Sequence, residues 1–260
     1  GGGGIPISVV YDPATNRAVF LPRAALQGGV WYTATLTAAI TDLMGNPLAA
    51  DAVWRFRTAD VAITGLSAAN SGPAALGHAV TLTATIATGS NVTYTWAFGD
   101  GVIGSGITAT HIYPTGGVYT AVVTAHNSVS TLPATTTVTI ITPTLAFSAA
   151  NYSVGEGDGA AVITVTLDVA AGVPVTVDYA TSDGSAAAWD DYTLISGTLI
   201  FTPGVTSRTI AVPIINDALD EYPETVYLTL SDPTRASIGG ANPATLYIID
   251  DDDPPAVAFS

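Results

Sequence analysis

Short segments in which apolar and polar side chains alternate run through almost the whole sequence, and this pattern constrains the fold most. In VTLTATI (80–86), the valine, leucine, alanine and isoleucine occupy one face and the threonines the other. AVWRFRT (52–58) places Trp54 and Phe56 on one side and two arginines on the other. A period of two residues predicts half-buried β-strands, because successive side chains of a strand point to opposite faces of a sheet.

Glycine, proline, asparagine and aspartate separate these segments at intervals of roughly 8–12 residues. No long segment with helical periodicity competes with them. Regularly spaced short strands of this kind are typical of β-sandwiches. Since a chain of 260 residues exceeds one domain of ordinary size, we expect an all-β protein built from Ig-like sandwiches in tandem.

Charge divides the sequence into three regions. The chain has no lysine and a net charge of −15. Residues 1–60 hold four acids and four arginines, residues 61–142 hold a single acid, and residues 143–260 hold sixteen acids and two arginines. This balance excludes nucleic acid as a partner, because nucleic-acid binding requires a basic surface. With 48% hydrophobic residues, the chain is still rich enough in apolar side chains to form buried cores.

A repeated segment marks the borders of the third region. PTLAFS (143–148) returns as PAVAFS (255–260) after 112 residues, as in tandem modules. The predicted domains are therefore 1–60, 61–142 and 143–253. Residues 254–260 are expected to begin a further repeat, or to be a strand exchanged with a neighbouring chain.

Several classes of protein are disfavoured by what the sequence lacks. It has no cysteine, so its domains need a staple other than a disulfide, or a sufficient core. No uninterrupted apolar stretch of about 18 residues predicts a membrane span. The motifs of serine hydrolases, zinc proteases and phosphate-binding loops are missing. Its acids crowd together at predicted strand ends instead of forming a separated acid–base pair, so we expect no enzyme.

The first two regions resemble known domain families. The YDPATN turn, WYTATLTA and DLMGNPLA of residues 11–59 resemble bacterial Ig-like domains of surface proteins. Because a complete Ig-like sandwich takes roughly 100 residues, this first domain is expected to be incomplete. TYTWAFGDG (93–101) and HIYPTGGVYTAVVTAHNS (111–128) resemble a PKD domain, with Trp96 as a core residue. Three sandwich domains, the first incomplete, are thus predicted.

The third region resembles a Calx-beta domain. The resemblance rests on YSVGEGDGAAVITVTL (152–167), VTVDYATSDGSA (175–186), the segment 191–233 and LYIIDDDD (246–253). It implies a two-sheet sandwich that binds calcium between the loops at one end. The implied ligands are Glu156, Asp183, Asp217, Glu221, Asp250, Asp251 and Asp252, with the backbone carbonyl of Leu219.

Two positions depart from the family pattern. Asn216 and Ala218 stand where members with full sites carry acids, which predicts the loss of one ion or a weaker subsite. Glu224 matches the family as well, with anchoring of its loop as the expected role.

The chemistry of the residues also favours calcium. Residues 143–260 contain neither cysteine nor histidine, which zinc and copper sites use, whereas carboxylates and carbonyls are the ligands of calcium. Two carboxylates about 4 Å apart repel by roughly 1–4 kcal/mol, so a cluster of them needs cations. The alternative is a solvated acidic run that only confers solubility. Acids at several separate strand ends, beside two nearly neutral regions, favour calcium.

These observations predict a non-catalytic, calcium-stabilised stalk of a secreted or cell-surface protein of bacterial type. An extracellular location follows because calcium sites of modest affinity stay filled only where calcium is abundant. One alternative is a subunit of an extracellular filament, assembled by β-strand exchange between copies. Another is a carbohydrate-binding module. Expected partners are calcium ions, other copies of the chain, another surface protein or a glycan. The carbohydrate alternative rests on Trp31, Trp54, Trp96 and Trp189.

Overall fold

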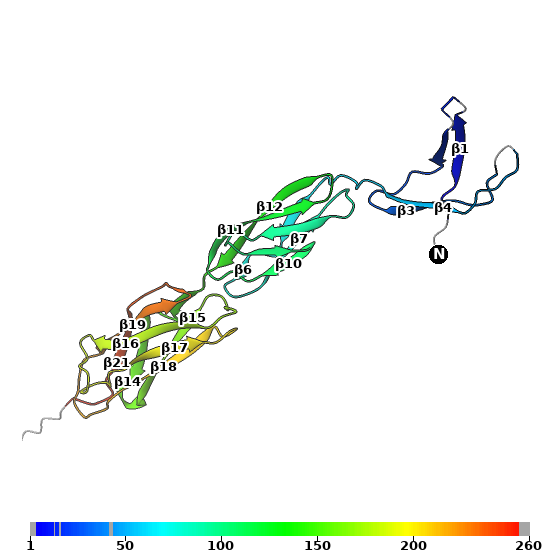
Figure 1. The fold of residues 1–260 in the computed structure, drawn as a ribbon. Coiled ribbons are helices and arrows are strands. Elements are labelled where there is room, and N and C mark those ends of the chain that lie inside the picture. The colour runs from blue at the N-terminus through cyan, green and yellow to red at the C-terminus, as the bar shows by residue number, and fades with distance from the viewer. Residues whose placement is uncertain (1–3, 13, 16, 42–43, 255–260) are drawn as a thin grey trace, which may run out of the picture. The chain divides into compact units, whose positions relative to one another are not determined.

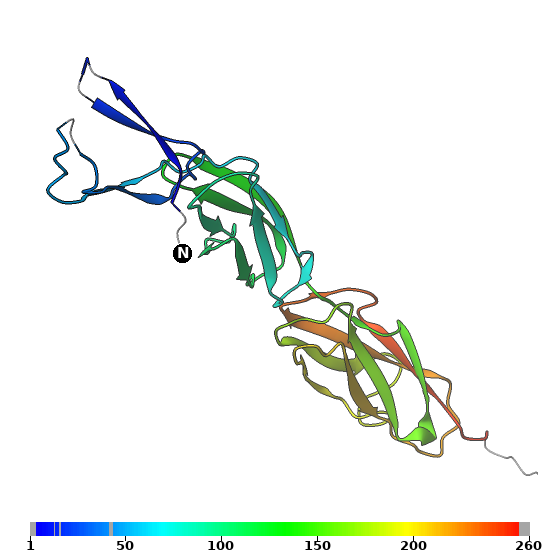
Figure 2. The same ribbon diagram turned by 90° about the vertical axis from the view of Figure 1, so that its right-hand side faces the viewer.

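The structure, a computed structural model, describes residues 4–12, 14–15, 17–41 and 44–254. Backbone contacts divide the chain into two compact units. Strands dominate both (Figures 1 and 2), and the one helical element of the described residues is the 3-10 turn η1 (Glu156–Asp158). The prediction of an all-β fold is confirmed. No helix of the described residues has the length and apolar character of a membrane span. The first unit comprises Gly1–Ala69, Thr83–Ala109 and Ala121–Thr136, and the second comprises Asn70–Leu82, Thr110–Thr120 and Thr137–Ser260.

Two β-hairpins make up the first region. Strand β1 (Ile7–Asp12) pairs antiparallel with β2 (Arg17–Pro22), and β3 (Trp31–Leu36) pairs antiparallel with β4 (Ala52–Arg57). Among the described residues, each of these sheets has two strands. The strand predicted at residues 52–58 is present, but its aromatic side chains are not buried. They face another hairpin instead of a complete sheet, which leaves Trp54 43% and Phe56 39% exposed.

The middle region forms two sheets whose strand orders are β10-β7-β5 and β6-β12-β11-β8-β9. The alternation predicted for residues 80–86 is confirmed, because Val80, Leu82 and Ala84 are fully buried. Trp96 is also fully buried, and its indole Nε1–H donates to the backbone oxygen of Gly106 at 3.1 Å. The strands are β5 (Ser67–Asn70), β6 (Ala74–Ala75), β7 (Val80–Thr85), β8 (Thr93–Ala97), β9 (Ile103–Ser105), β10 (Thr108–His111), β11 (Gly117–His126) and β12 (Thr131–Ile141).

The third region is a sandwich of a four-stranded sheet, β18-β15-β13-β20, and a five-stranded sheet, β14-β21-β19-β16-β17. Alternate residues of both sheets fill one continuous apolar core, which includes Ile163, Val177, Leu228 and Leu246. The strands are β13 (Thr144–Phe147), β14 (Asn151–Gly155), β15 (Ala160–Leu167), β16 (Val175–Asp183), β17 (Ser196–Phe201), β18 (Ser207–Pro213), β19 (Glu224–Thr234), β20 (Ser237–Ile238) and β21 (Ala244–Ile249). Residues 255–260, expected to begin another repeat or to be an exchanged strand, lie outside the described residues.

Within the first unit, a hydrogen-bond cluster around Asp60 follows the end of β4. The carboxylate of Asp60 accepts from Asn91 Nδ2 (2.6 Å), Arg57 Nη2 (3.1 Å) and Ser128 Oγ (2.5 Å). The hydrogen bonds from Ser128 and Asn91 lower the pKa of Asp60 to about 2, so this buried group is ionised at neutral pH. Next to it, the Nδ2 group of buried Asn127 donates to the backbone oxygens of Val61 and Ser90 at 2.7 and 3.0 Å.

We predict that Asn127→Ala lowers the unfolding free energy by about 2 kcal/mol, because several hydrogen bonds of a buried side chain are lost together. Urea denaturation followed by circular dichroism measures the change. Asn151→Ala, at an exposed position of β14, is the matched control and should leave the midpoint unchanged. Equal midpoints for the two variants would contradict the role assigned to Asn127.

Candidate metal centre

The register of the five-stranded sheet brings several acid-bearing segments to one end of the third region. The end of β14 lies beside the end of β21, and the start of β19 and the end of β16 meet them there. Figure 2 shows η1 and the C-terminal end of β21 at this same end. Residues far apart in the sequence are thereby collected at one edge. The backbone pairs that fix this arrangement are Gly155 with Ile249, Glu224 with Ile248, and Asp183 with Val226.

Three carboxylates form a first cluster at this end. Glu156, Asp250 and Asp252 each offer an oxygen, and these oxygens lie within 4.8 Å of one another. Glu156 is only 5% exposed. Its burial raises the pKa of its carboxyl group, and the charges of Asp217, Asp250 and Asp252 raise the pKa further. The cluster therefore gathers negative charge that its protein surroundings do not neutralise.

The loop after β18 closes over Glu156. The backbone N–H of Asp217 donates to Glu156 Oε1 at 2.8 Å, and Asp217 Oδ1 accepts from the backbone N–H of Leu219 at 2.7 Å. A leucine side chain has no ligand atom, so only the backbone carbonyl of Leu219 could take the role that the resemblance implies, and that role stays a prediction. This loop adds Asp217 to the edge of the first cluster.

One oxygen in the first cluster is buried without a partner. Asp252 Oδ2 makes no hydrogen bond to any described residue. Burial raises the pKa of Asp252, and the charges of Asp250 and Asp251 raise it further. A buried carboxylate oxygen without a donor is costly, and a bound cation would supply the missing partner. Since every candidate ligand atom here is an oxygen, the residues fit calcium.

A second cluster consists of Asp191, Glu221 and Glu224, whose carboxylate oxygens also lie within 4.8 Å of one another. Burial raises the pKa of Glu224 to about 7, together with a hydrogen bond to Asp191 and the charges of Asp191 and Glu221. Burial also raises the pKa of Glu221, and the charges that raise it further include those of Asp217 and Glu156. The carboxylates of the two clusters therefore act on one another.

Besides Asp217 and Leu219, two further predicted ligands, Asp183 and Asp251, lie in neither cluster. Asp183 Oδ1 accepts from the hydroxyl of fully buried Tyr192 at 2.7 Å and from the backbone N–H of Ala188 at 3.1 Å. Asp251 lies against Gly157, where an added Cβ would come within 2.6 Å of Asp251 Oδ2. A glycine at position 157 therefore gives this carboxylate its space. Coordination by Asp183 and Asp251 stays a prediction.

Asp191 was not among the ligands predicted from the sequence, and Glu224 was predicted only to anchor its loop. Asp191 follows Asp190 in the loop between β16 and β17, and this pair of acids shortly after a strand end was the available signal. Its position depends on the folding of that loop. The backbone oxygen of Asp191 accepts from Ile215 N–H at 2.9 Å, and its Oδ2 accepts from Ala187 N–H at 2.6 Å.

Three family models match the chain in tandem. Residues 1–58 match the bacterial Ig-like domain, residues 65–140 the PKD domain and residues 139–252 the Calx-beta domain. The resemblances read from the motifs are confirmed for all three regions.

Sodium/calcium exchangers are among the relatives of this chain. Over 96 residues the chain is 36% identical to sodium/calcium exchanger 1 of Rattus norvegicus. This match covers 30% of this chain and 10% of that protein. It is 30% identical over 115 residues to the sodium/calcium exchanger Calx of Drosophila melanogaster, covering 44% and 12%. The crystal structure of the apo-form Calx CBD1 domain is 30% identical, with a TM-score of 0.41, over 43% of this chain and 100% of that one. The chain spans about a tenth of the length of these curated exchangers.

We predict that Tyr192→Phe, measured in chelator, lowers the unfolding free energy by about 1–2 kcal/mol, because Asp183 loses a hydrogen bond from a buried hydroxyl. Tyr222→Phe is the control, since Tyr222 is 91% exposed, and it should have no effect. Chemical denaturation of both variants beside the unaltered chain provides the measurement. An unchanged midpoint for Tyr192→Phe would show that Asp183 is not held by this bond.

Proposed function

We propose that this protein is a non-catalytic extracellular structural module whose third domain is stabilised by calcium. The observation that carries the proposal is the buried, unpartnered Oδ2 of Asp252 within a cluster of three carboxylates. A solvated acidic run, which is the alternative, would leave its carboxylates in water. Glu156 is instead 5% exposed and lies beside two further acids.

The first cluster, of Glu156, Asp250 and Asp252, would hold the ion, with Asp217 at its edge. The second cluster, of Asp191, Glu221 and Glu224, offers another group of oxygens. Calcium supplies positive charge and takes six to eight oxygen ligands in a flexible geometry, so carboxylates from several loops can share it. The protein's own part is to bring these loops to one end of the sandwich and to bury Glu156.

The matched families support this assignment. The related exchangers are named for the ions that they exchange, and the Calx-beta model matches residues 139–252 of this chain. The PKD and bacterial Ig-like models support a surface protein of bacterial type. The proposed domains are 1–60, 61–142 and 143–253, close to the limits of these matches. In such an array calcium would act as the staple that a chain without cysteine lacks.

A stalk or spacer is the specific role we favour. The middle and third regions have buried apolar cores, and no catalytic motif accompanies the acid clusters. The carbohydrate-binding alternative loses one of its four tryptophans, because Trp96 is fully buried. Trp31 and Trp189 are 66% and 67% exposed, but no further observation makes either of them part of a sugar site.

We predict that calcium raises the unfolding free energy of the third domain, by about 4 kcal/mol at a thousand times its dissociation constant. Asp252→Asn should remove most of this gain, because it replaces the carboxylate that has the unpartnered oxygen. Calorimetric melts of the unaltered chain and of the Asp252→Asn variant, each with calcium and with chelator, measure the gain and its loss. Asp232→Asn is the matched control: it is exposed on β19, roughly 25 Å from Glu224 along the strand.

The control variant should keep the full calcium response, and its backbone φ of 48° is one that asparagine tolerates. Identical melts of the unaltered chain in calcium and in chelator would refute the proposed function. So would an Asp252→Asn variant that responds to calcium as the unaltered chain does.

A further inference from the structure

The first region has no apolar core of its own. Among residues 4–10, 12, 14–15, 17–41 and 44–58, no hydrophobic side chain is buried, whereas both later regions bury many. Its strands expose large apolar residues on both hairpins: Ile7 is 48%, Val9 55% and Val53 60% exposed. An exposed apolar surface of this kind marks an interaction site.

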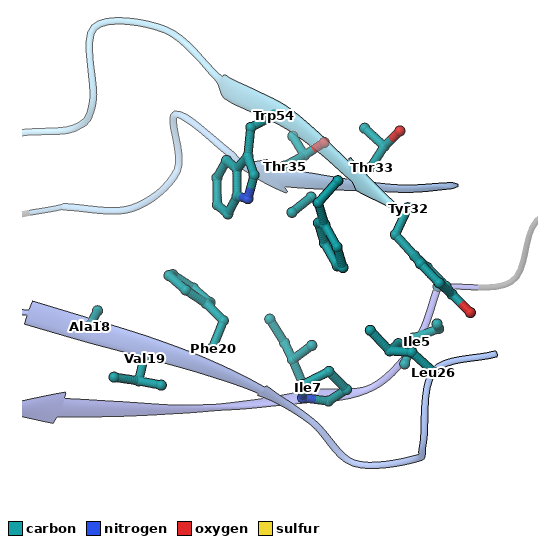
Figure 3. Close-up of a pocket in the computed structure, with 14 residues that line it drawn as sticks. Ile5, Ile7, Ala18, Val19, Phe20, Leu26, Tyr32, Thr33, Thr35 and Trp54 are labelled. Carbon is teal, nitrogen blue, oxygen red and sulfur yellow. The ribbon is translucent and has the colours of Figure 1, made fainter. Parts of the chain in front are cut away.

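An apolar groove runs between the two hairpins. Its volume is about 900 Å³, and Figure 3 shows Ile7 and Phe20 of one hairpin pointing toward Tyr32 and Trp54 of the other. The rings of Phe20 and Trp54 meet edge to face, with centroids 6.1 Å apart. Tyr32 stacks on Phe56 with centroids 5.7 Å apart. The contact between Phe20 and Trp54 joins the two walls, whereas Tyr32 and Phe56 belong to the same hairpin and stack within one wall.

The shape of the groove fits a β-strand. A hairpin of two strands is marginally stable in water, and independent stability needs a sheet of three or more strands with a hydrophobic face. Within the described chain, each strand of the two hairpins has one edge without a strand neighbour. A strand added there gains backbone hydrogen bonds, and every second side chain enters the groove. The occupant must therefore be an extended segment with apolar residues at alternate positions.

One segment of this chain has that pattern. PAVAFS (255–260) repeats PTLAFS (143–148), whose residues form strand β13. In β13, Leu145 is fully buried and Phe147 is 7% exposed, so this sequence pattern buries two alternate side chains between sheets. The corresponding residues of the repeat are Val257 and Phe259.

We propose that the groove binds Pro255–Ser260 of a second copy of this chain, added as a strand to one hairpin, with Val257 and Phe259 inserted. The groove and the segment are different surfaces, so the contact is heterologous and continues from copy to copy. This inference stands apart from calcium binding, because neither the groove nor the segment contains a residue of the two acid clusters.

The test is sedimentation equilibrium of the full chain over a range of concentrations up to about 1 mM. The average mass should rise with concentration beyond that of a dimer. A variant with Val257→Asp and Phe259→Asp should stay monomeric. The matched control, Ala256→Asp with Ala258→Asp, adds the same charge on the opposite face of the strand. It should associate at least tenfold more strongly than the first variant.

Crosslinking identifies the contact and the partner. Because the chain has no cysteine, Phe20→Cys combined with Phe259→Cys places one thiol in the groove and one in the segment. Oxidation should give disulfide-linked oligomers, and a control with Phe259→Cys and Val162→Cys, on an exposed position of β15, should give far fewer.

Four results would overturn the proposal. The unaltered chain could remain monomeric throughout the concentration range, or the two pairs of aspartate substitutions could weaken association equally. The disulfide could form within single chains, which would make the occupant residues 255–260 of the same chain. Fourth, the two cysteine pairs could crosslink to the same extent.

Discussion

Repulsion among carboxylates at one end of the third sandwich is the constraint on which the account depends. The pairing of β14 with β21 and of β19 with β16 brings these acids together, so the sheet cannot form without concentrating them. Packing of the apolar core fixes those strands, and repulsion among the acids at their ends therefore opposes this packing. Burial raises the pKa of Glu156, Glu224 and Asp252, and the charges of neighbouring carboxylates raise it further, as expected of acids gathered without a compensating positive charge. On the function that we propose, a divalent cation would resolve that conflict, and the stability of the third domain would then depend on calcium.

The three regions are stabilised in different ways. The middle region relies on a core around Trp96, and the third on a larger core with an acid-bearing end. The first region exposes its apolar residues and is joined to the rest of its unit through the charged hydrogen-bond cluster of Asp60. These differences follow the charge distribution of the sequence, in which the middle region holds a single acid. They are consistent with our proposal that the first region binds a strand of a second copy.

Much of the fold was readable from side-chain alternation, because burial on a strand follows a period of two. Val80, Leu82 and Ala84 are buried as their spacing predicts. The same rule failed for Trp54, since alternation tells which face a residue occupies and not whether another sheet covers that face. In the metal centre, Glu156 and Asp250 come together as strand ends should, but Asp191 depends on the path of a loop that no periodicity describes. Asp183 shows a different limit of the sequence prediction. It lies at the expected strand end, but its carboxylate accepts a hydrogen bond from the hydroxyl of buried Tyr192, which strand position does not predict.

Amide hydrogen exchange of the third region, with and without calcium, tests the central claim most directly. The N–H of Asp217, which donates to Glu156, and those of Asp250 to Asp252 report on the loops that the ion would join. The account predicts that calcium slows exchange in these loops, with little change in the strands of the core. Equal exchange rates in calcium and in chelator would mean that the carboxylates gather there without binding the ion.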